Sequence, residues 1–388
     1  MIPTARVCGV GFSALLSAAC ATSAGMRLGP EDGGCPDRAA AASGGAVTWY
    51  GPAGPGDEQS NERWCETVGS NVLEALPRAS FPSLGPSDSV AVVAWNILIG
   101  GGDVSLFLEE VLGYDCHPTS LELEAGFSHF VLLIQEAHRR SEAVPDVPES
   151  FKFPPRIEPE SAPEGWPDIV ELARDCGLAL FYVPSARNGP QTIGAEREDK
   201  GNAILSTLPL MDLLAIELPF EAGRKVAVGA TIAGPNGMQL RVVSVHVDVA
   251  STLYRTLTTA NTTRLRQAAG LIEALALIET GGVTSGIVSV GSGETSCGDL
   301  PGPIATVAAG DFNTWSAGES AVDQMRLCFP DSPPWDGKPT YGSFPTDFIF
   351  FRRAGDGRVS YLDGSQRRIE KRYGSDHQAR IAWFGRSE

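Results

Sequence analysis

Short apolar runs separated by polar stretches recur along the chain from residue 89 onward. They have the length and the content of β-branched and aromatic residues that are typical of buried strands. The runs are residues 89–98, 130–136, 178–184, 202–207, 226–233, 240–249, 304–312, 346–351 and 379–384.

Two other segments carry apolar residues at helical spacing. Residues 103–113 place Val104, Phe107, Leu108 and Val111 on one face, with Asp103 in the N-cap position. Residues 262–279 form a second amphipathic helix pattern. Many strands with few long helices predict two sheets packed face to face and covered by helices, an α/β sandwich.

The polar stretches divide the chain. Residues 1–27 form a signal region, residues 28–86 a linker with a small element, and residues 87–388 the main domain. Within the linker, residues 61–76 are expected to pack on the main domain through Trp64 and Leu73, tied by Cys65; a binding module is the alternative. Residues 185–201 and 281–302 are rich in polar residues and glycine and are expected to be excursions over the surface.

The first residues have the pattern of an export leader. Arg6 precedes an apolar stretch, residues 7–16, which small residues follow. The letters LLSAAC resemble a bacterial lipoprotein cleavage box in which Cys20 would be lipidated, although Ser17 stands where that box usually has leucine. We therefore expect an exported protein that is extracellular, periplasmic or lipid-anchored at the cell envelope. A buried N-terminal helix is the alternative, but the stretch has no polar face.

The cysteines, the charge and the apolar content narrow the class of protein. The six cysteines after the leader suit disulfides in an exported protein, leave the pairing open, and include no CxxC pair typical of zinc sites; they are Cys35, Cys65, Cys116, Cys176, Cys297 and Cys328. A net charge of -17 argues against binding nucleic acid by bulk electrostatics. Hydrophobic residues make up 43% of the chain, enough for a large core, and no later run is long enough to span a membrane.

Polar residues of a restricted chemical kind follow or open the strand-like runs. They are Asn96, Glu136, His246, Asp248, Asp311, Asn313, Asp347, Asp376 and His377. Each alone is more often a turn former or a solvated side chain, and the remaining histidines, His117, His129 and His138, are interpreted as structural. Gathered at one rim of a sandwich, the set would offer oxygen ligands for Mg²⁺ or Ca²⁺ and two imidazoles for proton transfer.

This chemistry suits the hydrolysis of a phosphate ester. The reaction needs the phosphoryl charge neutralised, a water deprotonated in line with the departing oxygen, and that oxygen stabilised. A metal held by carboxylates supplies the first and the third, and a histidine oriented by a carboxylate supplies the second.

The order of these motifs resembles the endonuclease/exonuclease/phosphatase superfamily, which includes deoxyribonuclease I-like nucleases, apurinic endonucleases, neutral sphingomyelinases and inositol polyphosphate 5-phosphatases. The resemblance covers roughly residues 87–384, and GDFN followed by SDH is its specific part. The matching motifs are WN at 95–96, QE at 135–136, GNAILS at 201–206, SVHVD at 244–248, GDFN at 310–313, DFIF at 347–350 and SDH at 375–377.

The resemblance implies a four-layer sandwich of two stacked mixed β-sheets flanked by helices. It implies that Glu136 is the principal metal ligand, with Asn96 beside it and Asp376 completing the metal shell. His377 paired with Asp347 would be the general base. The remaining motif residues would contact the phosphate or align the attacking water, His246 as a donor to a phosphoryl oxygen and Asp311 with Asn313 at the water and the phosphate.

The sequence also departs from the family pattern. Leu98 stands where many nucleases of the family have an acid or another polar group, and Asp103 is the nearest substitute. Ser244 stands where an asparagine is common. The family's phosphate-binding tyrosine or arginine has no assigned counterpart, and the candidates are Tyr182, Arg187 and Lys200.

The function expected from the sequence is an exported, Mg²⁺-dependent phosphodiesterase or nuclease, with Mn²⁺ or Ca²⁺ as other metals. A sphingomyelinase-like enzyme or an inositol-phosphate phosphatase is the first alternative. A catalytically inactive binding domain of the same fold is the second. The partner is a phosphoester, either nucleic acid or a small or lipid phosphate, and the oligomeric state is left open.

Overall fold

The computed structural model describes residues 25–28, 47–75, 89–117, 129–146, 165–188, 197–249, 260–280, 297, 302–362, 364 and 366–387. The predicted leader up to residue 24, with Cys20, lies outside the described residues, as do Cys35 and most of the predicted excursion at 281–302.

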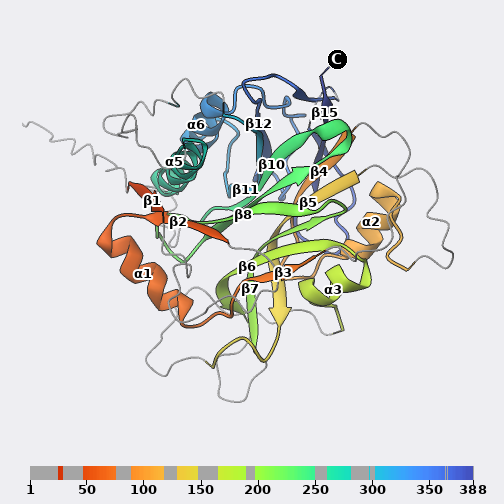
Figure 1. Cartoon of the computed structure of the whole chain (residues 1–388). Helices are drawn as coiled ribbons and strands as arrows, with labels where there is room; N and C mark the ends of the chain where they lie inside the picture. The colour runs from red at the N-terminus through yellow and green to blue at the C-terminus, as the bar shows by residue number, and fades with distance from the viewer. Residues whose placement is uncertain are drawn as a thin grey trace, which may run out of the picture.

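Two β-sheets form the centre of the molecule (Figure 1). The first has seven strands in the order β1 (Met26–Leu28), β2 (Thr48–Pro52), β8 (Leu210–Glu217), β9 (Val226–Ala233), β10 (Gln239–His246), β11 (Ala305–Asp311) and β12 (Asp347–Arg352). The second has eight strands in the order β13 (Val359–Tyr361), β15 (Arg380–Arg386), β4 (Ser89–Asn96), β5 (His129–Arg140), β7 (Glu198–Ser206), β6 (Ala179–Asn188) and β3 (Val72–Glu74), with β14 (Arg367–Arg368) paired to β15. Both sheets are mixed, because β10 runs parallel to β11 and β4 parallel to β5 among antiparallel neighbours.

Helices cover the outer faces of both sheets. The described helices are α1 (Pro55–Cys65), α2 (Val104–Leu112), α3 (Ile169–Asp175), α5 (Ala260–Glu279) and α6 (Ser320–Cys328), with a 3₁₀ turn η1 (Pro235–Gly237). Figure 1 shows α5 and α6 on the side of the seven-stranded sheet and α2 and α3 on the side of the eight-stranded sheet. The predicted four-layer α/β sandwich is therefore confirmed.

Three apolar layers hold the sandwich together. The central layer lies between the sheets and joins residues such as Val92 and Val131 of one sheet to Val228 and Val307 of the other. A second layer packs α2 and α3 on the eight-stranded sheet, and a third packs α5 and α6 on the seven-stranded sheet. Since the inner strands are covered on both faces, their sequences are nearly continuous apolar runs rather than alternating patterns.

Helix α2 forms as its sequence predicts. Its residues Val104, Phe107 and Leu108 are buried, and Asp103 Oδ1 accepts a hydrogen bond of 3.0 Å from Leu106 N at the N-terminus. The helix ends at Gly113, whose φ of +66° closes the last turn at low cost because glycine has no Cβ. This helix fixes the end of the loop that follows Asn96.

The prediction of a surface excursion over residues 185–201 is wrong at both ends. Residues 185–188 continue β6 and residues 198–201 begin β7. The polar residues there are buried in pairs rather than solvated: Arg139 Nε donates to Asp199 Oδ1 over 3.1 Å, and Tyr182 Oη donates to the same oxygen over 2.9 Å. Strand β8 and helices α3 and α6 also form without having been predicted.

The N-terminal region extends both sheets. β1 begins at Met26, inside the segment that the sequence assigns to the leader, and Met26 N donates to Glu273 Oε1 of α5 over 2.9 Å. As expected, Trp64 is buried and Leu73 packs against the central layer. Two disulfides, Cys116–Cys176 and Cys297–Cys328, lie in the described part of the chain, where no helix is long and apolar enough to cross a bilayer.

Candidate active site

The ends of neighbouring strands bring most of the predicted residues to one cleft of about 420 Å³. His246 ends β10 opposite Asp311 at the end of β11, and Asp311 in turn lies opposite Asp347, the first residue of β12. The cleft is lined by Asn96, Glu136, His246, Asp248, Asp311, Asn313, Asp376 and His377. Asp347 is fully buried and lies against His377. All nine predicted residues therefore lie in or directly behind one cleft.

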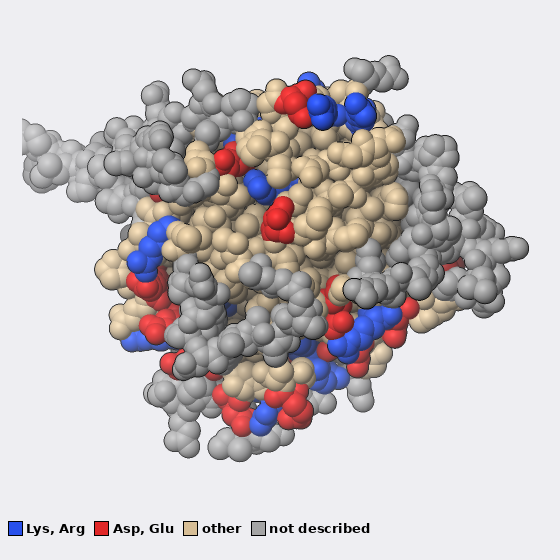
Figure 2. All heavy atoms as spheres, viewed as in Figure 1, with Lys and Arg blue, Asp and Glu red and all other residues tan. Residues whose placement is uncertain are grey.

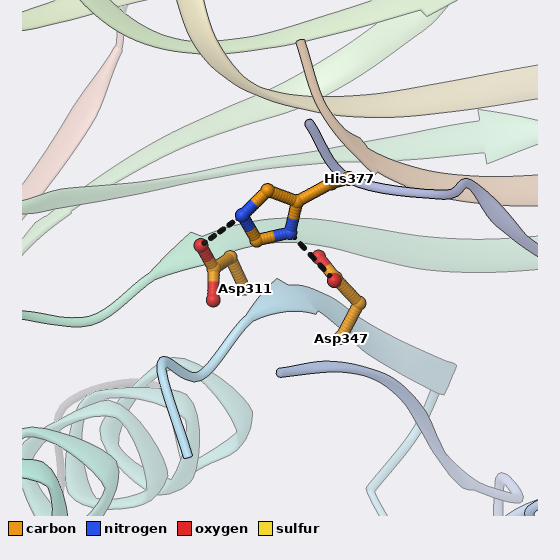
Figure 3. Close-up of side chains that lie close together, drawn as sticks. All are labelled: Asp311, Asp347 and His377. Atoms are coloured by element: carbon orange, nitrogen blue, oxygen red, sulfur yellow. Dashed lines mark hydrogen bonds and ion pairs between the residues drawn. The ribbon is translucent and has the colours of Figure 1, made fainter. Parts of the chain in front are cut away.

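The imidazole of His377 lies between two carboxylates (Figure 3). Its Nδ1 is 2.9 Å from Asp347 Oδ2, and its Nε2 is 3.9 Å from Asp311 Oδ2. This contact fixes the orientation of the ring and places a proton on Nδ1, which donates a hydrogen bond to Asp347. The other ring nitrogen, Nε2, therefore faces the cleft. This is the arrangement of a proton-transfer group with its orienting acid.

The backbone of the turn that carries His377 is fastened to the end of β4. His377 N donates to Ser375 Oγ over 3.0 Å, and Ser375 Oγ donates to the carbonyl of Asn96 over 2.7 Å. Trp95 Nε1 donates to the carbonyl of His377 over 3.2 Å. The general-base candidate is therefore positioned by buried hydrogen bonds rather than by a free loop.

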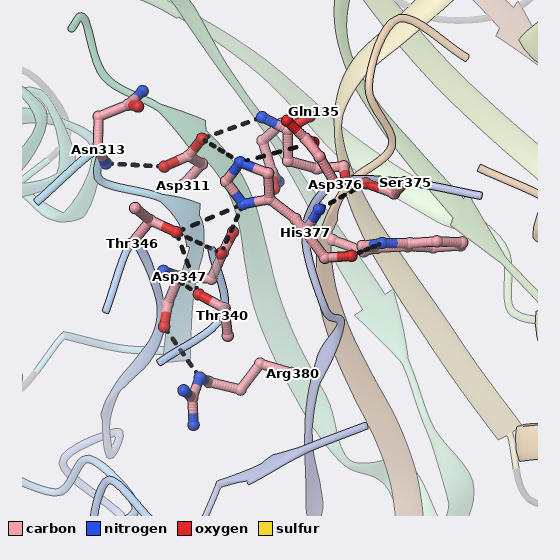
Figure 4. A network of polar contacts seen from close by, with 12 residues as sticks. Gln135, Asp311, Asn313, Thr340, Thr346, Asp347, Ser375, Asp376, His377 and Arg380 are labelled. Carbon is pink, nitrogen blue, oxygen red and sulfur yellow. Dashed lines mark hydrogen bonds and ion pairs between the residues drawn. The ribbon is translucent and has the colours of Figure 1, made fainter. Parts of the chain in front are cut away.

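Asp347 is held equally firmly (Figure 4). Thr346 Oγ1 donates to Asp347 Oδ2 over 2.8 Å, and Asp347 N donates to Thr340 Oγ1 over 3.1 Å. Arg380 Nε donates to the Asp347 carbonyl over 2.9 Å. The other carboxylate oxygen, Oδ1, is buried without a hydrogen-bond partner, so the contact with His377 is the main compensation for burying this carboxylate.

The carboxylates control protonation in this cluster. Burial lowers the pKa of His377, but Asp347 and Asp311 outweigh burial and raise it to about 10. Burial raises the pKa of Asp311 to about 7, although His377 opposes the rise. In the chain without a metal, His377 is thus an imidazolium at neutral pH, and Asp311 titrates near neutrality.

These shifts predict a pH-dependent stability in metal-free buffer. Because the folded pKa of His377 is raised from 6.5 to about 10, its stabilising contribution is complete below about pH 6.5 and is lost as the pH rises through about 10. We expect the Tm of the wild type to exceed that of His377→Asn most at pH 6 to 7, and the difference to shrink steadily toward pH 10. Thermal melts in EDTA measure it, and parallel Tm curves for the two proteins would contradict the assignment.

Glu136 enters the cleft from an irregularity in β5. The register between β5 and β7 shifts between Ile134 and Ala137, and Glu136 adopts a φ of +56°. The bulge turns Gln135 inward, where its Nε2 donates to Ser244 Oγ over 2.9 Å, and leaves Glu136 at the cleft. Such local strain in a residue without glycine's freedom is typical of functional positions.

Glu136 is kept ionised by its surroundings. Burial raises the pKa of this carboxyl, but Lys200, Lys225 and His377 together lower it below its usual value. The nearby Asp376 has a raised pKa, chiefly through burial, and its Oδ1 is buried without a hydrogen-bond partner. Asp376 Oδ1 also lies 4.0 Å from His377 Nε2. An ionised carboxylate beside a carboxylate oxygen that accepts no hydrogen bond is a donor set that a hard cation satisfies.

Asn96 faces the acids through its amide nitrogen. Its Nδ2 donates to Asp311 Oδ2 over 3.0 Å, while its Oδ1 accepts from Leu98 N over 3.1 Å. In this orientation Asn96 positions the carboxylate of Asp311, and the predicted role of Asn96 as a metal ligand stays a prediction.

His246 is paired with a lysine that the sequence reasoning missed. Lys225 Nζ lies 3.2 Å from His246 Nε2, and burial together with Lys225 holds the pKa of His246 well below its usual range. The Lys225 ammonium then donates a hydrogen bond to the neutral His246, and it is one of the cations that face the cleft. The only sequence signal for Lys225 is a basic pair, Arg224 and Lys225, directly before an apolar run.

The remaining predicted residues have structural contacts as well. Asp248 Oδ2 accepts hydrogen bonds from Ala222 N and Gly223 N, over 2.8 and 3.0 Å, and so fixes the loop that leads to Lys225. Asn313 donates its backbone N–H to Asp311 Oδ1 over 2.7 Å and its Nδ2 to the carbonyl of Val247 over 2.8 Å. Both residues line the cleft while shaping its walls.

Of the phosphate-binding candidates, Lys200 alone lines the cleft. Tyr182 is buried against Asp199, and Arg187 Nη1 donates to the carbonyl of Pro145, so both point away from it. Among the histidines interpreted as structural, His138 is buried at a separate cavity of about 140 Å³, and His129 Nδ1 lies 3.4 Å from Thr207 Oγ1.

The mouth of the cleft is partly apolar. Val249 and Tyr341 line it and are 55% and 41% exposed, and the Tyr341 ring lies 4.8 Å from the His377 ring. Leu98 and Ile99 line the wall after Asn96 with φ values of +48° and +52°. Asp103, the predicted substitute for an acid at this position, caps α2 instead.

Comparisons with known proteins give structural similarities only. No protein-family model and no curated protein matches the chain. The human Nocturnin catalytic domain with bound sulfate is 17% identical, with 77% of this chain and 95% of that chain covered and a TM-score of 0.44. An endonuclease/exonuclease/phosphatase from Beutenbergia cavernae is 12% identical, with coverage of 77% and 72% and a TM-score of 0.45. Sphingomyelinase C from Streptomyces griseocarneus is 15% identical, with coverage of 76% and 99% and a TM-score of 0.41.

Proposed function

We propose that the chain is a metal-dependent phosphoester hydrolase that acts on diesters, with its active site in the cleft between His377 and Lys200. The observation that carries this proposal is the buried pair of His377 and Asp347, aimed into a cleft that also holds Glu136 and Asp311. A proton-transfer group, carboxylates and cations within one cavity are the parts that phosphoester hydrolysis requires.

Glu136 and Asp376 would hold the divalent cation, with Asn96 beside them. The fit rests on the oxygen donors present and on Asp376 Oδ1, which is buried and accepts no hydrogen bond. When bound, Mg²⁺, or Mn²⁺ or Ca²⁺ in its place, would neutralise phosphoryl charge, stabilise the departing oxygen and offset the carboxylate charge around His377.

A second arrangement of potential ligands involves the base itself. Atoms of Asp311, Asp347 and His377 lie within 4.8 Å of one another and could hold an ion. If His377 Nδ1 and Asp347 Oδ2 were the ligand atoms, binding would break the 2.9 Å contact between them and the hydrogen bond from Thr346. Since several buried hydrogen bonds hold this pair together, we assign it to proton transfer and the metal to the Glu136 side.

The chain's own residues would divide the remaining work. As a neutral imidazole, His377 takes the proton of the attacking water on Nε2, while Asp347 keeps the opposite nitrogen protonated and stabilises the imidazolium that forms. Asp311, between His377 and Asn96, orients that water. Lys225 and Lys200 place positive charge near the phosphoryl oxygens. This attraction is strongest in the transition state, because negative charge develops on those oxygens there.

A second candidate, a hydrolase of small or lipid phosphoesters, is favoured over a nuclease by the cleft's lining. The lining contains Lys200 and Lys225 as cations, together with Arg224, whose Nε donates to Glu217 over 2.7 Å. On the face shown in Figure 2 acidic and basic side chains are intermixed, and the described residues form no broad basic area. Exposed Val249 and Tyr341 at the mouth suit an apolar or compact substrate better than a polyanion.

The exported location stays part of the proposal. The disulfides Cys116–Cys176 and Cys297–Cys328 support it, since disulfides persist mainly in oxidising compartments. Lipidation of Cys20 stays a prediction.

Hydrolysis of bis-p-nitrophenyl phosphate tests the function. We expect p-nitrophenol release in Mg²⁺ or Mn²⁺, its loss in excess EDTA, and its return when the metal is restored. Activity that survives EDTA would contradict the metal dependence. A folded protein that is inactive with each of Mg²⁺, Mn²⁺ and Ca²⁺ would instead support a binding domain. Plasmid DNA, RNA, sphingomyelin and inositol phosphates, compared under one metal condition, then separate the substrate classes.

A further inference from the structure

The groups in the cleft follow the order of the strands that carry them. The two sheets face each other strand by strand, so that β12 faces β15, β11 faces β4, β10 faces β5 and β9 faces β7. Along this direction come His377 with Tyr341, then Asn96 with Asp311, then Glu136 with His246, then Lys200 with Lys225. The cleft therefore has a base end near β15 and a lysine end near β7 and β9.

At the lysine end, a segment that belongs to none of these four facing pairs of strands reaches the cleft. We call residues 48–74 the N-terminal clasp: β2 pairs with β8 at the edge of one sheet, α1 crosses, and β3 pairs with β6 at the edge of the other. Figure 1 shows α1 beside these edges. Trp64, near the end of α1, lines the cleft together with Ser185 and Ala186 of β6. It is 5% exposed, so this large side chain is packed in place.

The start of α1 is tied to the cleft's wall. Asp57 Oδ1 accepts a hydrogen bond of 3.1 Å from Phe220 N, and Asp57 Oδ2 pairs with Arg266 of α5. Phe220 opens the loop that contains Gly223, which Asp248 holds from the other side. The clasp is thus bonded to the loop that presents Lys225.

The chain after α1 is tied to the eight-stranded sheet. Gly69 N donates to Asp199 Oδ2 over 2.8 Å, and Arg139 Nη1 donates to the carbonyl of Ser70 over 2.7 Å. A side chain at residue 69 would collide with the Arg139 guanidinium, whose nearest atom lies 2.1 Å from the added Cβ position, so glycine permits this close approach. With both ends anchored, Trp64 is a fixed wall rather than a movable lid.

In-line geometry assigns a role to that wall. Water activated between His377 and Asp311 attacks from the base end, so the departing oxygen must point away from it, toward Glu136 and the lysines. The leaving group then extends toward Trp64. Trp64 lines the cleft in this direction, together with Ser185 and Ala186 of β6, the strand beyond β7.

Resting on the proposed function, we propose that Trp64 closes the lysine end of the cleft and limits the leaving group of the substrate to a compact one. The substituent that remains bonded to phosphorus extends out of the cleft through the open mouth beside Tyr341. The enzyme is thereby selective for phosphoesters that release a short alcohol, and it discriminates against those whose leaving group continues as a chain.

Two esters that differ in leaving-group length test this. The first is methyl p-nitrophenyl phosphate, and the second is the same diester with a tri(ethylene glycol) chain on the nitrophenyl ring. We expect the wild type to prefer the short ester by roughly tenfold or more in kcat/KM, and Trp64→Ala to bring the ratio close to one by raising kcat/KM for the long ester. Trp64→Leu, which keeps an apolar side chain, replaces it if Trp64→Ala does not fold.

Trp383→Ala is the matched control, because Trp383 lies on β15 and does not line the cleft. The Trp383 ring packs under the Arg367 guanidinium, whose Cζ lies 4.7 Å from the ring centre. The ratio for this variant should equal that of the wild type. Equal hydrolysis of both esters by the wild type, or an unchanged ratio in a folded Trp64 variant, would overturn this inference and leave the proposed function standing. Failure of the wild type to hydrolyse either ester with any of the metals would overturn both.

Discussion

His377→Ala lowers kcat for bis-p-nitrophenyl phosphate by roughly 10²- to 10⁴-fold, the range expected when a positioned proton-transfer group is removed. The reason is geometric as well as chemical. The imidazole is fixed by Asp347 at 2.9 Å and the turn by Trp95 and Ser375, and a water molecule cannot reproduce that placement. The measurement is steady-state hydrolysis at saturating substrate in Mg²⁺, with the pH profile recorded for each protein.

The same substitution also removes the partner of a buried carboxylate. Asp347 is fully buried and its Oδ1 already lacks a hydrogen bond, so His377→Ala is expected to lower the Tm. His377→Asn, which retains a donor, keeps the activity test valid if the alanine variant unfolds. His117→Ala is the control, because His117 is exposed on a different segment. A folded His377 variant with wild-type kcat would remove His377 from the mechanism.

Glu136→Gln lowers kcat/KM by roughly 10²- to 10⁴-fold, which corresponds to the loss of several kcal/mol of charge stabilisation from the metal site. Glutamine has nearly the same shape as glutamate, and both residues meet the same strain at a φ of +56°. The substitution therefore removes the charge and leaves the bulge in β5 intact. We expect weaker binding of Mn²⁺ by titration calorimetry, a readout that does not depend on turnover.

Glu142→Gln is the matched control for this second variant. The side chain of Glu142 is 95% exposed, a few residues along the chain from Glu136, and faces solvent rather than the cleft. It should leave both Mn²⁺ affinity and kcat/KM unchanged. If Glu136→Gln binds Mn²⁺ as tightly as the wild type, the metal is held elsewhere, and Asp311, Asp347 and His377 become its ligands.

The fold was predictable wherever burial on both faces of a strand leaves a long apolar run. β4, β9 and β11 are such strands, and their runs coincide with the structure almost to the residue. β8 escaped because its leucine-rich sequence, LMDLLAIE, has only one of the β-branched residues that separate a strand from a buried helix, Ile216. The limits of β6 and β7 escaped for another reason. Their polar residues suggest an exposed loop, but they are buried in pairs such as Arg139 with Asp199.

Most residues of the candidate site, and the pairing of His377 with Asp347, could be predicted from the sequence, but Lys225 and Trp64 could not. Strand-end positions of one chemical type predicted that Asn96, Asp311 and His377 would converge, because the ends of neighbouring strands share an edge. Lys225 was missed because a single lysine before a strand carries no pattern, and its importance comes from contact with His246 across two strands. Trp64 was expected to pack on the main domain, but the path of α1 that brings it to the cleft depends on both sheet edges together.

The N-terminal clasp also covers strand edges at which copies of the chain could pair and aggregate. β2 and β3 occupy the outer sides of β8 and β6, whose main-chain N–H and C=O groups would otherwise be unpaired there. Unpaired strand edges are templates for intermolecular pairing and aggregation. A chain shortened to begin at β4 would present such an edge on each sheet, at the same side of the sandwich. With residues 48–74 in place, the sheets end at this side in β1 and β3, strands of three residues each, which offer a much shorter edge for such pairing.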